Sequence, residues 1–344
     1  MSVDEDFPSL LRRLVEGGTL SAEASLDAFG AIISGLVSEA RMSAFLTALA
    51  LREPTIAEIA GAARAMRRAM RSIEAPPGAL DLCGTGGDGH GTLNVSTAAA
   101  FVVAACGVPV AKHGNRNMSS KCGAADVLEA LDVRIDLSPQ AAQQCLAETG
   151  LCFLFAPAYH PAMKHVAPVR KELGFRTVFN LLGPICNPAG VRRQLLGVFA
   201  ERWVTPIAGV LAELGTEYAW VVHGCDGMDE LTLTGPSVVV EVANGASRRF
   251  EIAPGDVGLE RAELECLKGG DASHNAKALK HLLDCGGDRA YRDIVVLNAA
   301  AALVVAGTSG NLRNAAQLAQ TALDDGRARA KFEELRSATH RLAA

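Results

Sequence analysis

The sequence predicts an α/β protein with a small N-terminal helical domain and a larger α/β domain built on a mainly parallel sheet. Between Phe7 and Ser72, apolar residues recur three and four positions apart and strand patterns are absent. After Gly78, short apolar runs alternate with stretches long enough for helices, which is typical of βαβ units. The first of these runs leads into a glycine-rich loop, where ligands of parallel sheets commonly bind.

The N-terminal helices end at a predicted domain boundary. Thr55 and Glu58 have the spacing of a capping box, which predicts that a helix begins there and continues through Met70. Two prolines and a glycine within Glu74–Gly78 end the helical pattern. We therefore expect the helical domain at residues 1–75 and the α/β domain at residues 76–344.

Five apolar runs are candidate strands of the α/β domain: Leu80–Cys83, Val108–Ala111, Cys152–Phe155, Gln194–Val198 and Tyr218–Val222. Asn244 and Gly245 separate the runs Ser237–Val242 and Ser247–Ile252, which predicts a β-hairpin at a sheet edge. From Lys277 onward the pattern is helical again. Within it, Asn298–Ala306 is so rich in Ala and Val that we expect it to be buried.

Bulk composition limits the possible functions. The 344 residues are 49% hydrophobic but only 5% aromatic, so the core must consist mainly of aliphatic side chains. A net charge of −5 argues against nucleic-acid and membrane-surface binding. The apolar windows are too short to span a bilayer. Nine dispersed cysteines without a signal-peptide pattern predict reduced thiols in the cytoplasm, with neither disulfides nor a zinc site.

The stretch from Leu80 to Thr97 has the features of a phosphate-binding loop. Its glycines can adopt positive φ and bring backbone N–H groups close to an anion. Asn94, Ser96 and Thr97 follow at the expected start of a helix, where hydroxyls, N–H groups and the helix dipole favour negative charge. We expect a phosphorylated ligand here.

A second polar loop follows the next predicted strand, from Lys112 to Asp126. Lys112 and the Ser119–Ser120 pair suit phosphate oxygens as a point charge and as hydrogen-bond donors. Such a loop on its own could equally be a solvated basic turn. Its occurrence after a neighbouring strand favours a shared anion site.

A third segment follows Cys152–Phe155. Arg170 could clamp a carboxylate, although Arg170 and Lys171 also fit a solvated helix face. His160 and His165 fit packed or exposed histidines better than metal ligands. Residues Asn180–Pro188 are expected to form a Gly/Pro-rich apolar loop, either the wall of a pocket for a flat ring or merely a turn.

Adjacent carboxylates at Asp229 and Glu230 follow the strand predicted at Tyr218–Val222. Alone they could form a solvated acidic turn. A phosphate site elsewhere in the chain favours Mg²⁺, which binds through one or two carboxylates together with water and phosphate.

These motifs together resemble the anthranilate phosphoribosyltransferases, of the nucleoside phosphorylase-like phosphoribosyltransferase group, along essentially the whole chain. The motifs are G-T-G-G-D-G at Gly84–Gly89, N-x-S-T at Asn94–Thr97, K-H-G-N-R at Lys112–Arg116, H-P-A-M-K-H-V-A-P-V-R at His160–Arg170, N-L-L-G-P at Asn180–Pro184 and D-E at Asp229–Glu230. The first two motifs are also similar to those of the pyrimidine nucleoside phosphorylases.

The resemblance implies a homodimer whose subunits hold the active site between the two domains, with part of 160–195 joining the helical domain. It implies attack of the anthranilate amine on phosphoribosyl pyrophosphate (PRPP), giving phosphoribosyl anthranilate and pyrophosphate in tryptophan biosynthesis. It also implies two Mg²⁺ ions per subunit, held by Ser96, Asp229 and Glu230.

Carried over position by position, the resemblance implies three further sets of residues. PRPP would contact Gly84, Gly87, Asp88, Thr92, Asn94, Val95, Ser96, Thr97, Lys112, His113, Gly114, Asn115, Arg116, Asn117, Met118, Ser119, Ser120 and Ala124. Anthranilate would contact Gly84, Asn115, His160, Arg170, Gly183 and Pro184. The residues assigned to catalysis are Lys112, His113, Asn115 and Arg170, with Asn115 and Arg170 orienting the substrate and His113 or His160 considered as a proton acceptor.

The chain departs from the family pattern at two positions. Ala124 stands where many members have serine, so a phosphate contact there would have to come from the backbone. His274 stands where an acidic residue is expected, without affecting a catalytic assignment. Two alternatives remain: a pyrimidine nucleoside phosphorylase, disfavoured by the Asp229–Glu230 pair and N-L-L-G-P, and a non-catalytic nucleic-acid-binding relative, disfavoured by the net negative charge.

Overall fold

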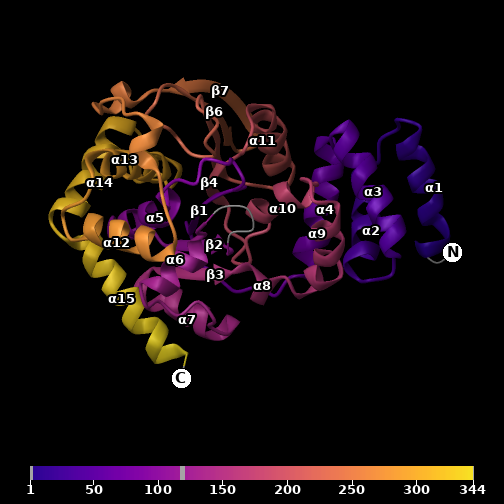
Figure 1. The fold of residues 1–344 in the computed structure, drawn as a ribbon, viewed down its shortest axis with the longest axis horizontal. Coiled ribbons are helices and arrows are strands. Elements are labelled where there is room, and N and C mark those ends of the chain that lie inside the picture. Colours follow the sequence, from indigo (N-terminus) through magenta and orange to yellow (C-terminus); the bar gives the residue numbers. More distant parts are fainter. Residues whose placement is uncertain (1–2, 117–120, 344) are drawn as a thin grey trace.

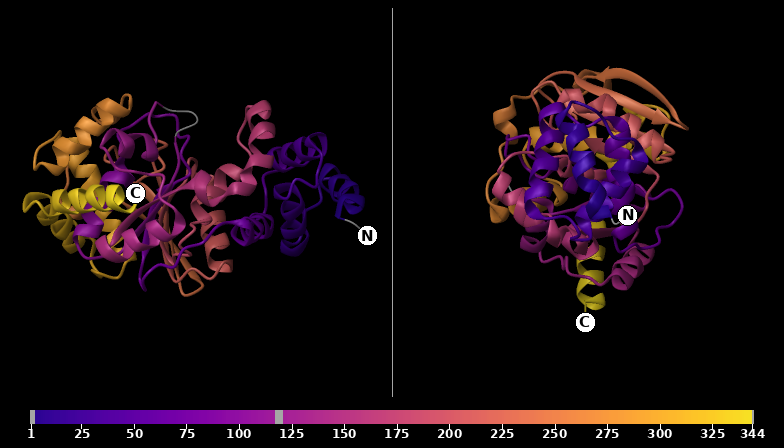
Figure 2. Two further views of the ribbon diagram at one scale, coloured as in Figure 1. Left: turned by 90° about the horizontal axis from the view of Figure 1, so that it is seen from below. Right: turned by 90° about the vertical axis from the view of Figure 1, so that its right-hand side faces the viewer.

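The computed structural model describes residues 3–116 and 121–343, which form an elongated molecule with helices at both ends (Figure 1). Helices α1–α4 form one end, α12–α15 lie at the other, and the sheet lies between them (Figures 1 and 2). In the part of the chain described, no helix combines the length and the apolar character needed to cross a bilayer.

The N-terminal segment is helical, as the sequence predicts, and α4 begins at the predicted capping box. The bounds of its helices are Val3–Val15 (α1), Ala22–Ile33 (α2), Glu39–Arg52 (α3) and Ile56–Ala69 (α4). The capping box is confirmed, because the Thr55 hydroxyl accepts from the Glu58 N–H and the Glu58 carboxylate accepts from the Thr55 N–H. Glu58 is almost fully buried, where it also accepts from the Leu20 N–H and pairs with Arg52, so this cap joins two helices.

The sheet has seven strands in the order β3-β2-β1-β4-β5-β6-β7. The strands are Leu80–Gly84 (β1), Val110–Gly114 (β2), Leu151–Phe155 (β3), Arg193–Gly197 (β4), Tyr218–Gly224 (β5), Ser237–Ala243 (β6) and Ala246–Ile252 (β7). The first five are parallel and the last two add an antiparallel hairpin at the edge. All five predicted parallel strands and the hairpin at Asn244–Gly245 are confirmed, but β2 begins two residues later than predicted and includes Lys112–Gly114, which the sequence assigns to the following loop.

Further helices lie between and after the strands. They are Val95–Ala105 (α5), Ala124–Ala130 (α6), Pro139–Thr149 (α7), Ala156–Tyr159 (α8), Ala167–Leu173 (α9), Phe179–Ile185 (α10), Val204–Glu213 (α11), Ala272–Leu283 (α12), Arg289–Val305 (α13), Leu312–Asp324 (α14) and Arg327–Leu342 (α15). Most of them cover the sheet, whereas α9 packs against α3 of the N-terminal helices. Short 3₁₀ helices span Pro161–His165, Glu201–Trp203, Pro254–Val257 and Leu264–Leu267. The predicted burial of Asn298–Ala306 is confirmed in α13, where Ala299–Leu303 have no exposed surface.

One predicted loop is wrong. Residues Phe179–Ile185 form the short helix α10, with Pro184 inside it, rather than a Gly/Pro-rich loop. Leu181, Leu182 and Ile185 are buried among the residues of the N-terminal helices, and this packing outweighs the poor helix propensity of Gly183 and Pro184. The Asn180 side chain supports the helix start by accepting from the Thr177 N–H.

The buried apolar residues form two clusters. One surrounds β1–β3 and helices α5, α13 and α15. The other contains the buried faces of α1–α4 together with Val166–Cys186, α11 and inward residues of β4–β6. The core of the N-terminal helices is thus continuous with segments far along the chain. The division at residues 75 and 76 stays a prediction, but it does not coincide with a break in the core.

Candidate active site

The glycine-rich loop that the sequence predicts to bind phosphate lies at the carboxyl end of β1. Gly86 and Gly87 have φ values of 66° and 75°, in the left-handed region that glycine adopts without strain. The loop leads into α5, whose N-cap is Asn94. The Asn94 side chain does not cap the helix but accepts a 2.9 Å hydrogen bond from Asn275 on α12.

Asp229 lies directly on this loop. Its Oδ2 accepts a 2.6 Å hydrogen bond from the Gly86 N–H. A Cβ atom at Gly84 would come within 2.3 Å of the same oxygen. Glycine at position 84 therefore allows the acidic segment after β5 to approach the end of β1.

Glu230, Ser96 and Lys112 form the next part of the site. Glu230 Oε1 accepts from the Ser96 N–H at 3.2 Å, and Ser96 Oγ accepts from Lys112 Nζ at 3.2 Å. Lys112 is 4% exposed and also donates to the Leu82 carbonyl at 2.6 Å. A residue of β2, the segment that follows β5 and the start of α5 therefore meet beside β1.

The ionised forms of Asp229 and Glu230 are electrostatically unfavourable at these buried positions. Burial is the main cause that raises the pKa of Asp229, and repulsion from Asp88 adds to it. Burial likewise raises the pKa of Glu230, reinforced by Asp229 and opposed by the ammonium of Lys112. Such a pair is stabilised by a cation.

The donor set fits Mg²⁺ that is shared with a phosphorylated ligand. Among residues 3–116 and 121–343, no group of three or more His, Cys, Asp or Glu side chains forms a metal cage. Mg²⁺ rarely uses such cages and binds through one or two carboxylates with water and phosphate oxygens. Asp229, Glu230 and the Ser96 hydroxyl supply a set of this kind.

The other residues predicted to contact PRPP in this loop make different kinds of contact within the protein. Asp88 accepts from the His90 N–H, and Thr92 pairs with Lys268 in an isolated bridge. Val95 and Thr97 are each 2% exposed, so their side chains belong to the core. Gly87 presents its carbonyl to the guanidinium of Arg176.

The loop after β2 is only partly described. Asn115 and Arg116 are exposed, and the Asn115 side chain accepts from the Arg116 N–H. Arg116 forms ion pairs with Asp126 and Glu129 of α6, so acidic side chains engage its guanidinium. Gly114 ends β2 and Ala124 opens α6. The predicted residues Asn117, Met118, Ser119 and Ser120 lie outside the described residues.

His113 and His160 are neighbours beneath this loop. Their ring centroids are 5.2 Å apart and both side chains are buried. Burial, followed by repulsion between the rings, lowers the pKa of His113 to about 3, and burial lowers that of His160 to about 4. Both imidazoles are therefore neutral at pH 7 and cannot contribute positive charge.

Arg170, Gly183 and Pro184 come from the helices that follow β3. The Arg170 guanidinium lies 5.7 Å from the Phe179 ring centroid, and burial lowers its pKa. Gly183 and Pro184 belong to α10, and the Pro184 carbonyl accepts from Gln194 of β4 at 2.6 Å. The segment predicted as a loop, either a pocket wall or a turn, is thus largely a helix that is hydrogen-bonded to β4 beside β1.

Some residues around the site carry no sequence signal that would identify them. Arg176 stacks on Phe199 at 4.2 Å while it contacts the Gly87 carbonyl. Asp81 and Asn187 are buried together under Lys112 and His113. Asp81 stands inside an apolar strand and Asn187 between apolar residues and Pro188, so only the fold reveals that they are paired.

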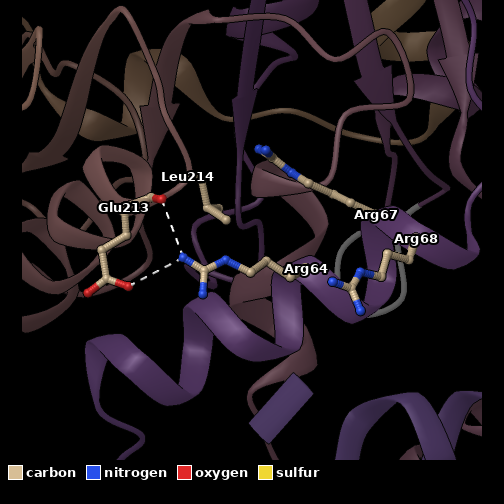
Figure 3. A pocket seen from close by; sticks show the side chains of 5 residues that line it. All are labelled: Arg64, Arg67, Arg68, Glu213 and Leu214. Atoms are coloured by element: carbon tan, nitrogen blue, oxygen red, sulfur yellow. Dashed lines mark hydrogen bonds and ion pairs between the residues drawn. The ribbon is translucent and has the colours of Figure 1, made fainter. Parts of the chain in front are cut away.

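A cavity of about 320 Å³ lies elsewhere and shares none of these residues (Figure 3). It is lined by Arg64, Arg67, Arg68, Glu213 and Leu214. Arg64 donates to the Glu213 carbonyl at 3.4 Å, and Arg67 donates twice to the Ile185 carbonyl. Two of its arginines thus tie α4 to the ends of α11 and α10, which indicates a structural junction.

Comparisons with known proteins agree with this architecture. Residues 8–70 match the family model described as glycosyl transferase family, helical bundle domain, and residues 76–329 match that of the a/b domain. An anthranilate phosphoribosyltransferase of Azorhizobium caulinodans is 52% identical over 98% of both chains. One from Rhodopseudomonas palustris strain BisB18 is 54% identical over 96% of this chain and 97% of its own.

Solved structures show the same fold. The crystal structure of anthranilate phosphoribosyltransferase from Thermus thermophilus has a TM-score of 0.91 and 44% identity, covering 96% of this chain and 99% of its own. The Saccharomyces cerevisiae enzyme in complex with PRPP and Mg has a TM-score of 0.90 and 28% identity, covering 98% and 99%. The chain therefore belongs to the glycosyl transferase family with these two domains and, within it, to the anthranilate phosphoribosyltransferases.

Proposed function

We propose that this chain transfers the phosphoribosyl group of PRPP to the amine of anthranilate, releasing pyrophosphate, as a step of tryptophan biosynthesis in the cytoplasm. The observation that carries the proposal is the convergence of Ser96, Lys112, Asp229 and Glu230 beside the glycine loop at the end of β1. An ammonium, two carboxylates and a loop of backbone N–H groups suit a ligand that brings both phosphate and a divalent cation.

Stabilising the departing pyrophosphate is the main task of the site. Displacement at the anomeric carbon develops negative charge on the leaving group. We infer that Asp229, Glu230 and Ser96 hold two Mg²⁺ ions per subunit, which when bound supply positive charge to the pyrophosphate oxygens. The relative from Saccharomyces cerevisiae was solved with PRPP and Mg, which supports the use of this ion.

Lys112 and the glycine loop act on the same charge without a metal. Lys112 Nζ has three N–H bonds, and two of them point to the Leu82 carbonyl and to Ser96 Oγ, so the third can reach a phosphate oxygen. N–H groups of residues 84–91 would cradle the phosphates. Removing one such prearranged donor commonly reduces the rate on the order of 10²–10³-fold.

Anthranilate is positioned by the segments that follow β2 and β3. We assign its carboxylate to Arg170, whose partial burial strengthens a charge-assisted pair. Asn115 would help to orient it, and His160 with Gly183 and Pro184 would line its path. The neutral imidazoles of His113 and His160 can accept a hydrogen bond, but their lowered pKa values make both of them weak bases at pH 7. An arylamine is already nucleophilic at pH 7, so its orientation matters more than a strong base.

We propose that the protein acts as a homodimer. Val15 at the end of α1, Leu36 between α2 and α3, and Leu51 near the end of α3 are 75%, 60% and 84% exposed. Large apolar side chains exposed at one end of the molecule support contact with a second subunit.

A fluorescence assay that follows anthranilate consumption in the presence of PRPP and Mg²⁺ tests the function directly. We expect turnover with these substrates and none with inorganic phosphate and a pyrimidine nucleoside. Turnover with the nucleoside pair alone would favour a nucleoside phosphorylase. A folded protein inactive with both pairs but retained by nucleic acid would favour the non-catalytic relative.

A further inference from the structure

The ladder between strands β1 and β2 stops short of the site and leaves a gap in the backbone hydrogen bonding. Their ladder pairs a single position, Leu80 with Val110, whereas β1 pairs with β4 and β2 pairs with β3 over five positions each. Beyond Leu80 and Val110, side chains bridge the two strands. Asp81 of β1, Lys112 of β2 and Asn187 occupy this gap.

Asp81 is the centre of the bridge and has no exposed surface. Its Oδ1 accepts from the backbone N–H of His113 at 3.1 Å, and its Oδ2 accepts from Asn187 Nδ2 at 2.8 Å. The orientation of Asn187 is set independently, because its Oδ1 accepts from the Ala189 N–H and its Nδ2 also donates to the Ala111 carbonyl. Two donors therefore face two oxygens, and only an ionised carboxylate satisfies both.

The positive charge of Lys112 stabilises the ionised form of the buried Asp81 carboxylate. Burial raises the pKa of Asp81, and attraction to the Lys112 ammonium is the largest effect that opposes the rise. Lys112 spans the same gap from the other strand, since its Nζ donates to the Leu82 carbonyl on β1 and to Ser96 on α5. Asp81 thus holds the backbone on one side of Lys112 and attracts its charge.

We propose that Asp81 is a positioning residue for Lys112: held by Asn187, it sets the separation of β1 and β2 that places the Lys112 ammonium at Ser96 and the phosphate loop. The inference rests on the proposed function, because it concerns how the site receives pyrophosphate. A purely electrostatic view gives the opposite expectation, since removing a negative charge from a phosphate site should tighten anion binding. The two views therefore predict changes of opposite sign.

The test measures binding of inorganic pyrophosphate, in the presence of Mg²⁺, by titration calorimetry. In Asp81→Asn, an amide can satisfy only one of the two donors, so the bridge is broken and its charge removed. We expect pyrophosphate to bind about tenfold more weakly, with a matching rise in KM for PRPP and an unchanged KM for anthranilate. Asn187→Ser leaves every charge in place and should weaken binding in the same direction by about threefold.

A double-mutant cycle with Lys112→Met separates positioning from general damage. If Asp81 acts through Lys112, Asp81→Asn should change pyrophosphate binding by less than about twofold once Lys112 is absent. If Asp81→Asn does not fold, Asn187→Ser completes the same cycle. Thr149→Val is the matched control: it removes buried hydrogen bonds to the Leu151 backbone at the opposite end of β3 and should leave pyrophosphate binding unchanged.

Several results would overturn the inference. Tighter or equal pyrophosphate binding by Asp81→Asn would do so, and so would an equal loss with and without Lys112 or an equal loss in Thr149→Val. A wild-type protein that neither binds pyrophosphate nor turns over PRPP would overturn the proposed function as well. A wild type that does both beside an unaffected Asp81→Asn variant would overturn this inference alone.

Discussion

Gly197 and Asp229 are in direct backbone contact. A Cβ atom at Gly197, the last residue of β4, would lie 1.5 Å from the Asp229 carbonyl oxygen and 2.4 Å from its carbonyl carbon. No side chain fits such a space, because real Cβ contacts are about twice as long. The acidic segment can therefore approach the carboxyl end of β4 only if residue 197 is glycine.

Gly197→Ala should displace the Asp229 backbone and remove most of the activity. We expect kcat/KM for PRPP to fall at least about tenfold and the free energy of unfolding to fall by about 1–3 kcal/mol or more from overpacking. Steady-state kinetics and urea denaturation measure the two effects. Gly255→Ala, where the added Cβ meets no neighbour within 4 Å, is the matched control and should retain activity.

Replacing Asp229 and Glu230 by their amides should abolish Mg²⁺-dependent turnover and yet stabilise the metal-free fold. Turnover should fall at least about 100-fold, since the cation site is lost. Burial raises both pKa values, so the folded wild type binds protons more tightly than the unfolded chain. Its stability therefore falls as the pH rises from the ordinary carboxyl pKa through the raised pKa values of the folded state. At pH 8 with a chelator, Asp229→Asn with Glu230→Gln should melt at a higher temperature than wild type. A lower melting temperature would contradict the repulsion inferred between the two carboxylates.

His113 and His160 should make the protein sensitive to mild acid. Their pKa values, lowered to about 3 and about 4 by burial, lie below the ordinary value of 6.5 that applies to the unfolded chain. The unfolded chain therefore binds more protons between these limits, so stability is full above pH 6.5 and declines as the pH falls. At pH 5 each histidine should cost about 2 kcal/mol of unfolding free energy. Urea denaturation of His160→Gln should show a smaller loss between pH 7 and pH 5, and a loss as large as that of wild type would refute the assignment.

Arg170→Ala should impair anthranilate binding selectively. Loss of a charge-assisted pair should raise KM for anthranilate by about tenfold or more, with little change in KM for PRPP. Lys171→Ala removes the neighbouring, exposed cation of α9 and provides the control. Equal increases in both KM values would show that Arg170 does not orient anthranilate.

Local patterns in the sequence predict most of the fold. Each parallel strand overlaps a short apolar run, and the capping box at Thr55 and the turn at Asn244–Gly245 have short-range signals that the structure confirms. Helix α10 could not be predicted in this way. Its formation depends on contacts with the N-terminal helices, more than a hundred residues away, whereas Gly183 and Pro184 locally disfavour a helix.

The residues of the candidate site likewise fall into those that the sequence predicts and those that only the tertiary structure reveals. Ser96, Lys112, Asp229 and Glu230 follow strands or open a helix, so the topology of a parallel sheet predicts that they meet. Arg116 is a plausible anion ligand in sequence, but Asp126 and Glu129 engage it in the fold. The sequence does not predict that Asp81 is buried, because a carboxylate within an apolar strand would be expected to face solvent. Its role depends on a gap between strands that no local pattern encodes.

The apolar cluster that α1–α4 share with α10, α11 and the sheet bears on how the chain loses its structure. The sequence matches two domain families, but the helical domain cannot move away from the α/β domain without exposing the buried apolar residues that both contribute to this cluster. Heat should therefore melt the chain in one cooperative transition, and a fragment ending near residue 75 should not fold alone. Any movement of α1–α4 during the reaction must therefore be small enough that water does not enter the shared apolar cluster.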